Sequence, residues 1–540
     1  MSVISREIPT SSKNFFTIDG HSLCTEKLYE IVKKDIKIKI SSKARIAIQK
    51  SRALLEDFID ENRIIYGVNT SMGGFVNWLI PGENAQELQD NLIAAVATNV
   101  GQYLDDHTVK ASMLARLNSL ARGMSAISLE NFNILLEMYN KGVLPCIPSK
   151  GSLGASGDLG PLACIALVGT GKWKAKYDGK ILPGGEVLKR AGIKPMTLSY
   201  KEGLSLINGT STMTGLSAML VEEAINLVRT YDAISSLTFE GLQVKKKPFN
   251  PKVHKQKLHQ GQLTTALNLW KILEDSQMIV DEGAVEKKLQ KEQKNKPAPA
   301  DSPIEDAYSI RCTPHVMGPI RDSLKSIRQT INNELNSSSD NPLVIPEEND
   351  VFHNGHFHGQ YISMAMDQLS ISLTTLSNLS DRRIDRFMDK SNNNNLPPFL
   401  CAEKPGLRLG LMGGQFMATS VTAENRSLCV PLSVQTLTST GDFQDIVSLG
   451  LVASRRAKEI LNNTMYVLAF ELLCAAQAAD IRGAESLSSG SKKTYESVRK
   501  VVPYLSSDKP LTDYLEELKR LIQSGKVLKK IEKEVGDLRL

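Results

Sequence analysis

Residues 151–162 read Gly-Ser-Leu-Gly-Ala-Ser-Gly-Asp-Leu-Gly-Pro-Leu, and the rest of the chain is interpreted around this stretch. Its centre, Ala155-Ser156-Gly157, is a run of three small residues flanked by further glycines. Glycine adopts backbone conformations that other residues avoid, so the main chain can fold tightly back on itself here. If the Gly157 nitrogen attacks the Ala155 carbonyl, a five-membered ring closes. Loss of that water and of the Ser156 hydroxyl leaves an electrophilic methylidene-imidazolone. The alternative is an ordinary Gly/Ser-rich loop before the apolar helix near Leu162.

Further motifs support the chemical interpretation of this stretch. They are Tyr66-Gly67-Val68-Asn69-Thr70, Leu206-Ile207-Asn208-Gly209-Thr210, Tyr308-Ser309-Ile310-Arg311, Glu334-Leu335-Asn336, Asp340-Asn341-Pro342, Phe357-His358-Gly359-Gln360, Glu424-Asn425-Arg426 and Gln444-Asp445. With them, residues 64–483 resemble the aromatic amino-acid ammonia-lyase and aminomutase family. Residues 66–75 (YGVNTSMGGF), 95–101 (AVATNVG) and 382–391 (RRIDRFMDKS) are most similar to bacterial phenylalanine 2,3-aminomutases of antibiotic pathways.

The resemblance implies a mainly α fold. Its core is a bundle of long helices of the fumarase/aspartase-like superfamily, with a small mixed N-terminal domain. Ile362, Met366, Leu369, Leu373 and Leu376 repeat at spacings of four and three, which is typical of a bundle seam. Residues 467–479 are apolar on nearly all faces, as in a helix at the centre of a large body or at a subunit interface. We predict an N-terminal MIO-bearing domain over 1–210, a long-helix core over 211–485 and a C-terminal helical segment over 486–540.

Local patterns predict several elements. Helices are expected over 23–34, 42–61, 105–124 and 129–141, and a small hairpin over 174–180. Residues 66–77 form a loop with three glycines, which the resemblance makes an inner lid carrying Tyr66. Residues 286–303 are dense in Lys, Glu, Pro and Ala, so we expect a mobile outer loop or a solvated charged loop.

Composition excludes several classes of protein. The net charge of +6 over 540 residues is small, and the basic residues do not alternate with aromatic ones, which argues against nucleic-acid binding. The seven cysteines are scattered without metal-ligand spacing, as expected for thiols in a reducing cytoplasm. Residues 1–14 lack an apolar signal region, and no apolar run of membrane-spanning length is evident. We therefore predict a cytoplasmic protein with no membrane partner.

The resemblance also assigns a cofactor and an assembly. It implies that Ala155-Ser156-Gly157 cyclises autocatalytically to 4-methylidene-imidazole-5-one (MIO), so that no external cofactor and no metal are expected. Such a ring captures the substrate amine covalently and makes it a better leaving group. The family is a homotetramer whose active sites draw residues from three subunits.

Further roles are carried over from the family to matching positions. Tyr66 is the base, although the ordinary tyrosine pKa of about 10 must be lowered for this role. Arg311 binds the substrate carboxylate with its planar guanidinium. Asn208 is a second polar contact near the carboxylate and ring, and Tyr308 is the second active-site tyrosine. The remaining contacts to the substrate or the ring are Phe357, Glu424 and Gln444.

Val96 is the position that we expect to select the side chain of the substrate. Tyrosine- and histidine-selective relatives have a histidine at this position, whereas Ala94, Ala95 and Val96 form an apolar wall here. A phenol hydroxyl buried without a partner costs roughly 1–3 kcal/mol, which favours phenylalanine. The predicted activity is that of an isomerase, a phenylalanine 2,3-aminomutase acting through cinnamate to give β-phenylalanine, with ammonia-lyase side activity. A phenylalanine or tyrosine ammonia-lyase and a tyrosine 2,3-aminomutase remain alternatives.

Other classes of function are less well supported. His353, His356 and His358 could bind a metal, but Gly355 and Gly359 place them in a loop. Residues 154–157 are one residue short of a serine-hydrolase motif. A helical assembly protein without catalysis is opposed by the intact Tyr66, tripeptide and Arg311. This chain has His315 and His356 where the family usually has Gln and Asn, and both lie beside predicted site residues, so we expect them to affect hydrogen bonds to Arg311 or to the ring.

Overall fold

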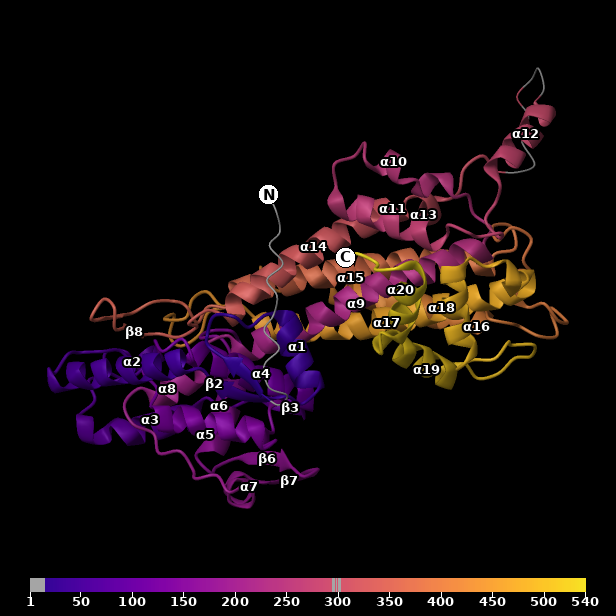
Figure 1. Ribbon diagram of the computed structural model, residues 1–540. Coiled ribbons are helices and arrows are strands. Elements are labelled where there is room, and N and C mark those ends of the chain that lie inside the picture. The colour runs from indigo at the N-terminus through magenta and orange to yellow at the C-terminus, as the bar shows by residue number, and fades with distance from the viewer. Residues whose placement is uncertain (1–14, 294–296, 298, 300–302) are drawn as a thin grey trace. The chain divides into compact units, whose positions relative to one another are not determined.

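The computed structural model describes residues 15–293, 297, 299 and 303–540 (Figure 1). The chain forms two compact units that each combine segments distant in sequence. Unit 1 contains the described residues up to Met219 together with 328–366 and 431–454. Unit 2 contains the described residues of 220–327 together with 367–430 and 455–540. This partition is discontinuous, and the three consecutive domains stay a prediction.

The predicted mainly α character is confirmed. The helices are α1 (Thr25–Lys33), α2 (Ser42–Asp60), α3 (Ala85–Ala95), α4 (Asp106–Leu120), α5 (Leu129–Asn140), α6 (Leu159–Gly169), α7 (Gly184–Ala191), α8 (Glu202–Ile207), α9 (Ser211–Gly241), α10 (Pro251–His254), α11 (Gln260–Ile272), α12 (Glu282–Glu292), α13 (Tyr308–Arg311), α14 (Thr313–Leu335), α15 (Gln360–Met388), α16 (Met412–Leu428), α17 (Gly450–Arg482), α18 (Ser489–Arg499), α19 (Thr512–Gln523) and α20 (Lys526–Val535). Short polar side chains begin several of them: Ser41, Asp105 and Ser128 accept hydrogen bonds from the first turns of α2, α4 and α5.

The described strands are short and form four small sheets. The strands are β1 (Phe15–Ile18), β2 (Lys37–Ile40), β3 (Val100–Tyr103), β4 (Leu144–Pro145), β5 (Pro148–Lys150), β6 (Lys174–Tyr177), β7 (Lys180–Pro183), β8 (Leu343–Ile345) and β9 (Asp350–Phe352). β1 and β2 pair in parallel, and the other pairs are antiparallel. The predicted hairpin is β6–β7, turned by Asp178 and Gly179 with φ of 46° and 76°, the left-handed values of a tight hairpin turn.

Unit 2 is organised by long helices that run side by side (Figure 1). Arg383 of α15 is fully buried and donates to the Tyr231 hydroxyl of α9 at 2.9 Å. It also forms an ion pair with Glu471 of α17 at 3.3 Å. Its Nε donates to the Ser309 carbonyl of α13 at 2.8 Å. One guanidinium therefore joins three core helices to the short helix that carries Arg311.

The centre of the bundle is apolar. The expectation that no apolar run reaches membrane-spanning length is wrong, because α17 is long and apolar enough, by length and composition, to cross a membrane; 83% of that window is buried inside the structure. Its run 467–479 is buried throughout, as predicted. Because helices at the centre of a protein core pass the same hydropathy test, the burial favours core packing as the explanation. The C-terminal helix α20 packs by Val527, Leu528 and Ile531 against Ala233 and Ile272.

Both predicted lids differ from simple loops. The inner lid, residues 66–77, is irregular apart from one short 3₁₀ turn over Gly73–Phe75, and its base is anchored because Ile65 and Val68 are buried in the core of unit 1. The first part of the predicted outer loop 286–303 is helical, because it lies within α12. This helix starts after Asp281, whose side chain accepts hydrogen bonds from the first backbone N–H groups. Residues 294–296, 298 and 300–302 lie outside the described residues.

The close contact between Gly414 of α16 and Phe470 of α17 leads to a prediction about the free energy of unfolding. A Cβ atom on Gly414 would lie 2.0 Å from the Phe470 ring, whereas nothing lies within 4 Å of one on Gly413. We expect Gly414→Ala to lower the free energy of unfolding by about 1–3 kcal/mol through overpacking. The control Gly413→Ala raises it by roughly 0.5–1 kcal/mol, since alanine is the better helix former. Urea unfolding at fixed protein concentration measures both, and equal shifts would contradict the packing argument.

Candidate active site

The Ala155-Ser156-Gly157 stretch is a tight turn whose ends are bridged. Gly154 and Gly157 pair with each other and have φ of 83° and 73°, in the left-handed region that favours glycine. A Cβ atom on Gly157 would lie 2.1 Å from the Gly209 carbonyl oxygen, and one on Gly154 would lie 2.4 Å from the Ser448 hydroxyl. The two glycines are therefore required by close packing on two other segments as well as by the turn.

Gly209 holds the turn through its backbone. Its N–H donates to the Ser156 carbonyl at 3.1 Å, and its carbonyl accepts the Asp158 N–H at 2.7 Å. On the other side, the Leu449 N–H donates to the Leu153 carbonyl at 3.2 Å. The Ala155–Gly157 tripeptide is thus held between a segment that precedes α9 and one that precedes α17.

Asp158 ends the turn as a fully buried acid. One carboxylate oxygen accepts the Met213 N–H in the first turn of α9 at 2.7 Å, and the other accepts the Ser152 hydroxyl at 3.3 Å. Burial raises the pKa of Asp158 to about 7, and the nearby Glu334 charge acts in the same direction against the lowering effect of these hydrogen bonds. The helix N-terminus gives the carboxylate a partly favourable place.

A pocket of about 590 Å³ opens over the turn within unit 1. The residues that line it are Ile64, Tyr66, Thr70, Val76, Ala155, Ser156, Leu204, Asn208, Asn341, His353, Asn354, Gly355, Phe357, His358, Phe443, Gln444, Asp445 and Ile446. Six predicted site residues belong to it: Tyr66, Ala155, Ser156, Asn208, Phe357 and Gln444. Most of its exposed lining surface is apolar, as in small-molecule sites generally, although more than half of the lining residues carry a polar side-chain group.

Tyr66 reaches this pocket from the base of the inner lid. Its hydroxyl oxygen accepts the Gly73 N–H at 3.3 Å, and its backbone N–H donates to His353 Nε2 at 3.1 Å. The Tyr66 and His353 rings meet edge to face with centroids 6.4 Å apart. Burial raises the pKa of Tyr66, and the Gly73 hydrogen bond only partly opposes this. In these surroundings the phenol stays protonated at neutral pH.

Asn208 is almost completely buried, with 2% of its surface exposed. Its amide nitrogen donates to Asp340 Oδ1 at 3.1 Å and to the Asn341 carbonyl at 3.0 Å. Its amide oxygen is enclosed and has no hydrogen-bond partner among the described residues. Asn208 therefore contributes to the pocket lining a polar side chain whose amide oxygen makes no hydrogen bond to the described residues.

The other predicted residues of unit 1 lie around the pocket or behind it. Gly157 is buried behind the turn, and Gln444 accepts from the Ser439 hydroxyl at 3.1 Å while lining the pocket. Val96 ends α3, is half-buried and is not part of the lining. Leu204 and Phe443 are apolar residues of this lining, and the role of Val96 beside the substrate side chain stays a prediction.

Tyr308, Arg311 and Glu424 belong to unit 2 and are not part of the pocket lining. Tyr308 is 71% exposed, and the Arg311 guanidinium lies 4.8 Å from the centre of its ring. Arg311 pairs with Glu305 at 2.8 Å, and its buried Nε has no partner within the part of the chain that the structure describes. Glu424 is exposed on α16. Arg311 is therefore only partly satisfied by unit 2.

The unusual histidines have separate surroundings. The His315 ring lies 5.4 Å from the His254 ring, and burial lowers the His315 pKa with a further contribution from the His254 charge. His356 is exposed and outside the pocket lining, whereas His353 and His358 line it. Among the described residues, no group of three or more His, Cys, Asp or Glu side chains could hold a metal ion.

Sequence reasoning missed Leu204 and Phe443 as pocket residues. Leu204 precedes the Leu206–Thr210 motif by two residues, and Phe443 directly precedes Gln444, so their proximity to motifs was the available signal. A Cβ atom on Gly67 would lie 2.5 Å from the Leu204 side chain, which shows how closely the lid base packs on α8.

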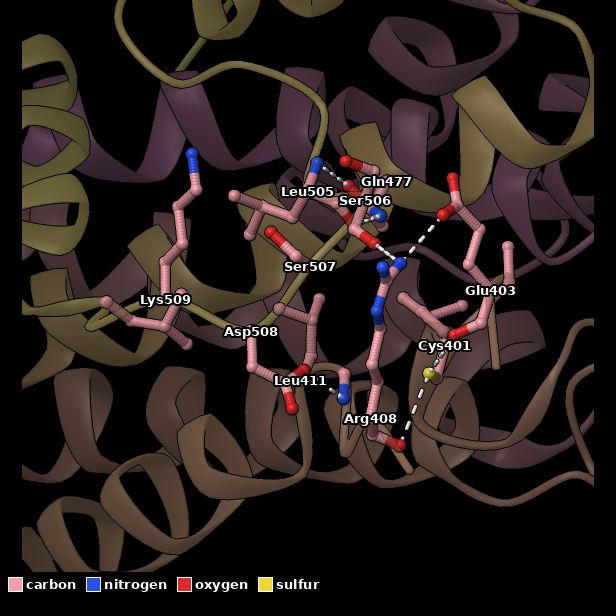
Figure 2. A pocket seen from close by; sticks show the side chains of 14 residues that line it. Cys401, Glu403, Arg408, Leu411, Gln477, Leu505, Ser506, Ser507, Asp508 and Lys509 are labelled. Atoms are coloured by element: carbon pink, nitrogen blue, oxygen red, sulfur yellow. Dashed lines mark hydrogen bonds and ion pairs between the residues drawn. The ribbon is translucent and has the colours of Figure 1, made fainter. Parts of the chain in front are cut away.

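Unit 2 contains a second, much smaller hollow (Figure 2). Arg408 crosses it and pairs with Glu403 at 2.7 Å, while Asp508 accepts the Leu409 and Gly410 N–H groups at 2.8 and 3.0 Å. Its volume of about 20 Å³ is enough for one water molecule. This hollow cannot take an organic substrate, so the pocket over the turn is the candidate active site.

A long-helix fold with a clamped Ala-Ser-Gly turn facing a tyrosine defines the class of MIO-dependent helical enzymes. The aromatic amino acid lyase family model matches residues 23–500, and the chain belongs to this family. The fold is accordingly that of the fumarase/aspartase-like helical class, as predicted.

Individual relatives cover nearly the whole chain. The structure of Pantoea agglomerans phenylalanine aminomutase is 55% identical with a TM-score of 0.92, covering 95% of this chain and 99% of that one. Tyrosine ammonia-lyase of Cupriavidus metallidurans is 40% identical, covering 94% and 96%. Histidine ammonia-lyase of Natranaerobius thermophilus is 38% identical, covering 97% and 99%.

The buried Asp158 makes a prediction about pH and stability. The folded state holds the Asp158 proton more tightly than the unfolded chain, whose aspartate pKa is about 4. The free energy of unfolding therefore falls as pH rises from about 4 to about 7, by an amount of order 4 kcal/mol, and stays low above pH 7. Urea midpoints of the wild type and Asp158→Asn at pH 5 and pH 8 test this. We expect a smaller loss of stability in the variant, and parallel losses would refute the assignment.

Proposed function

We propose that the chain is a phenylalanine 2,3-aminomutase that converts L-α-phenylalanine to β-phenylalanine through cinnamate. The observation that carries this proposal is the pocket in which Tyr66 and the Ala155–Ser156 turn share one cavity. The 55% identity to a phenylalanine aminomutase over 95% of the chain supports the choice of reaction and substrate. The proposal makes the enzyme an isomerase within the lyase family.

The residues of the turn fit the prosthetic group that the family implies. The left-handed Gly157 and the absence of space for a side chain there favour the close approach of its nitrogen to the Ala155 carbonyl. Asn208 lines the same pocket as Ala155 and Ser156. We propose that Ala155, Ser156 and Gly157 form MIO without an external cofactor. The ring, once formed, supplies an electrophilic carbon that binds the substrate amine.

Tyr66 is the proposed base for the β-proton. Its hydroxyl lies in the same pocket as the turn, held by the Gly73 N–H of its own lid. Because burial raises the pKa of Tyr66, the phenolate fraction is small at neutral pH and grows about tenfold per pH unit. The rate should therefore increase on the alkaline side of neutrality until another group titrates.

Binding of the substrate carboxylate is assigned to Arg311. Among the described residues its ion pair is with Glu305, and the guanidinium has further donors with which to bind a carboxylate. We propose that the protein is a homotetramer, as in the family, and that Tyr308, Arg311 and Glu424 enter the pocket from neighbouring subunits. Phe357 and Gln444 come from the same subunit as Tyr66.

An ammonia-lyase is the second candidate function. The tyrosine and histidine ammonia-lyases at 40% and 38% identity favour it, since both reactions share the elimination step. The two activities differ in whether cinnamate and ammonia are kept until nitrogen returns at the β-carbon. The phenylalanine side chain suits the apolar wall of Ile64, Val76 and Leu204.

The prosthetic group has a direct signature in the mass of the protein. We expect the intact wild-type chain to be lighter than its sequence by two water molecules. Ser156→Ala should show the unmodified mass because it removes the hydroxyl that leaves. Ser149→Ala, a change in the nearby strand β5, is the matched control and should keep the loss. An unmodified wild-type mass would refute cyclisation.

Products of L-phenylalanine distinguish the two candidate activities. We expect mostly β-phenylalanine by chromatography, whereas mostly cinnamate and ammonia would make the protein a lyase. Tyr66→Phe should lower kcat by about 10²–10⁴-fold, the usual contribution of a general base. Tyr177→Phe in the β6–β7 hairpin is the control and should leave the rate unchanged. A fully active Tyr66→Phe would exclude Tyr66 as the base.

A further inference from the structure

One histidine of the cluster His353, His356 and His358 contacts the segment that carries Tyr66. His353 Nε2 accepts the Tyr66 backbone N–H at 3.1 Å, across 287 positions of the sequence. The two rings also meet edge to face, with their centroids 6.4 Å apart. The proposed reaction uses no atom of this histidine, so the contact needs an explanation of its own.

The base of the inner lid is tied to the rest of unit 1 at the backbone of Tyr66. The N–H groups of the residues on either side, Ile65 and Gly67, donate to side chains of the lid itself at 2.8 and 3.1 Å. The Tyr66 N–H between them instead leaves the lid and donates to His353. This hydrogen bond therefore connects the residue that carries the phenol to a different part of the fold.

The backbone at His353 is held by the same core as the lid base. His353 directly follows β9, which pairs with β8 in an antiparallel hairpin. Val344 of β8 is completely buried in a hydrophobic cluster with Ile65 and Val68, and Val351 of β9 packs against that cluster. The hairpin and the lid base therefore share one set of apolar contacts, which fixes the distance between them.

A polar contact joins the same two segments. Arg63, three residues before Tyr66, forms an ion pair with Asp350 of β9 at 2.5 Å. The His353 side chain itself is exposed and lines the pocket. Because an exposed side chain adds little to the core, the stability of the hairpin does not account for a histidine at this position.

The geometry of the contact specifies which nitrogen of His353 is used. A backbone N–H can only donate, so Nε2 must be unprotonated and the proton of the neutral ring lies on Nδ1. Nε2 is at the far end of the side chain. A glutamine carries its amide oxygen at a similar distance from the backbone, whereas an asparagine is one methylene shorter and does not reach.

The other end of Tyr66 is held less firmly. Its hydroxyl oxygen accepts the Gly73 N–H at 3.3 Å, which is long for a hydrogen bond of this kind, and Gly73 belongs to the lid itself. A general base must lie within hydrogen-bond reach of the proton that it takes. Since a misplacement of about 1 Å can cost 10²-fold in rate, the attachment of the Tyr66 backbone matters for catalysis.

We propose that His353 is a positioning residue whose Nε2 holds the Tyr66 backbone against unit 1 and thereby keeps the phenol where it takes the β-proton. The inference rests on the proposed function for the role of Tyr66. It gives the first histidine of the cluster a part in the geometry of the base, with no direct contact to the substrate.

The matched substitutions His353→Gln and His353→Asn test the proposal in the full-length protein, because they introduce the same amide at two distances. We expect His353→Gln to keep kcat within about threefold of the wild type. His353→Asn should lower kcat roughly tenfold and change KM for phenylalanine less than about twofold. His259→Asn, at the exposed residue before α11, is the control and should change neither constant.

Two kinetic outcomes overturn the proposal. Equal losses of kcat in His353→Gln and His353→Asn would show that the reach of the acceptor is irrelevant. A large increase in KM at unchanged kcat would make His353 a contact of the substrate. The rate can be followed through either product, β-phenylalanine or cinnamate, so the test does not depend on how the reaction divides between them.

Hydrogen–deuterium exchange, measured by mass spectrometry on the peptide that contains residue 66, reads out the contact without turnover. An N–H bonded to His353 is protected, so His353→Asn should add about one deuteron to this peptide at short times, whereas His353→Gln should not. If the wild type converts no phenylalanine, the proposed function is refuted and this comparison still tests the contact. Unchanged exchange in His353→Asn overturns the inference.

Discussion

The close approach of two backbone segments at Gly157 and Gly209 is the constraint on which the site depends. With no room for a Cβ atom at Gly157, the peptide of Gly209 can both donate to Ser156 and accept from Asp158. This contact sets the position of the turn relative to the start of α9, and hence of Asn208, one residue before Gly209. Packing at this density leaves no freedom for larger residues.

Several ionisable side chains near the site are buried, and burial of an ionised group without a partner costs free energy. Burial raises the pKa of Asp158, Glu334 and Tyr66, and only hydrogen bonds oppose the rise. The Lys201–Asp340 pair is the complementary case, because a buried cation there balances a buried carboxylate. Polar groups that are held in place before a ligand arrives are the general basis of preorganised binding.

Many helices could be predicted from the chain because their signals are local. Ser41, Asp105 and Ser128 are caps, and the 362–376 spacing marks a helix face that is buried in α15. The small sheets β1–β2, β3–β5 and β8–β9 were not predicted, since strands of three or four residues are defined by partners distant in sequence. The helical start of 286–303 was also missed, because its cap at Asp281 lies outside the charged run.

The sequence by itself was enough to locate the Ala-Ser-Gly tripeptide, the motif residues and the family. These depend only on the types of residue and on their spacing along the chain. Only the tertiary structure decided which of them share a pocket. It brought Tyr66 beside Ala155 and Asn208 and left Val96 out of the lining. It also fixed the Asn208 amide through Asp340, which is 132 residues away along the chain. Such contacts join residues that are far apart in the sequence, so they depend on the tertiary fold of the backbone and cannot be inferred from a local sequence pattern.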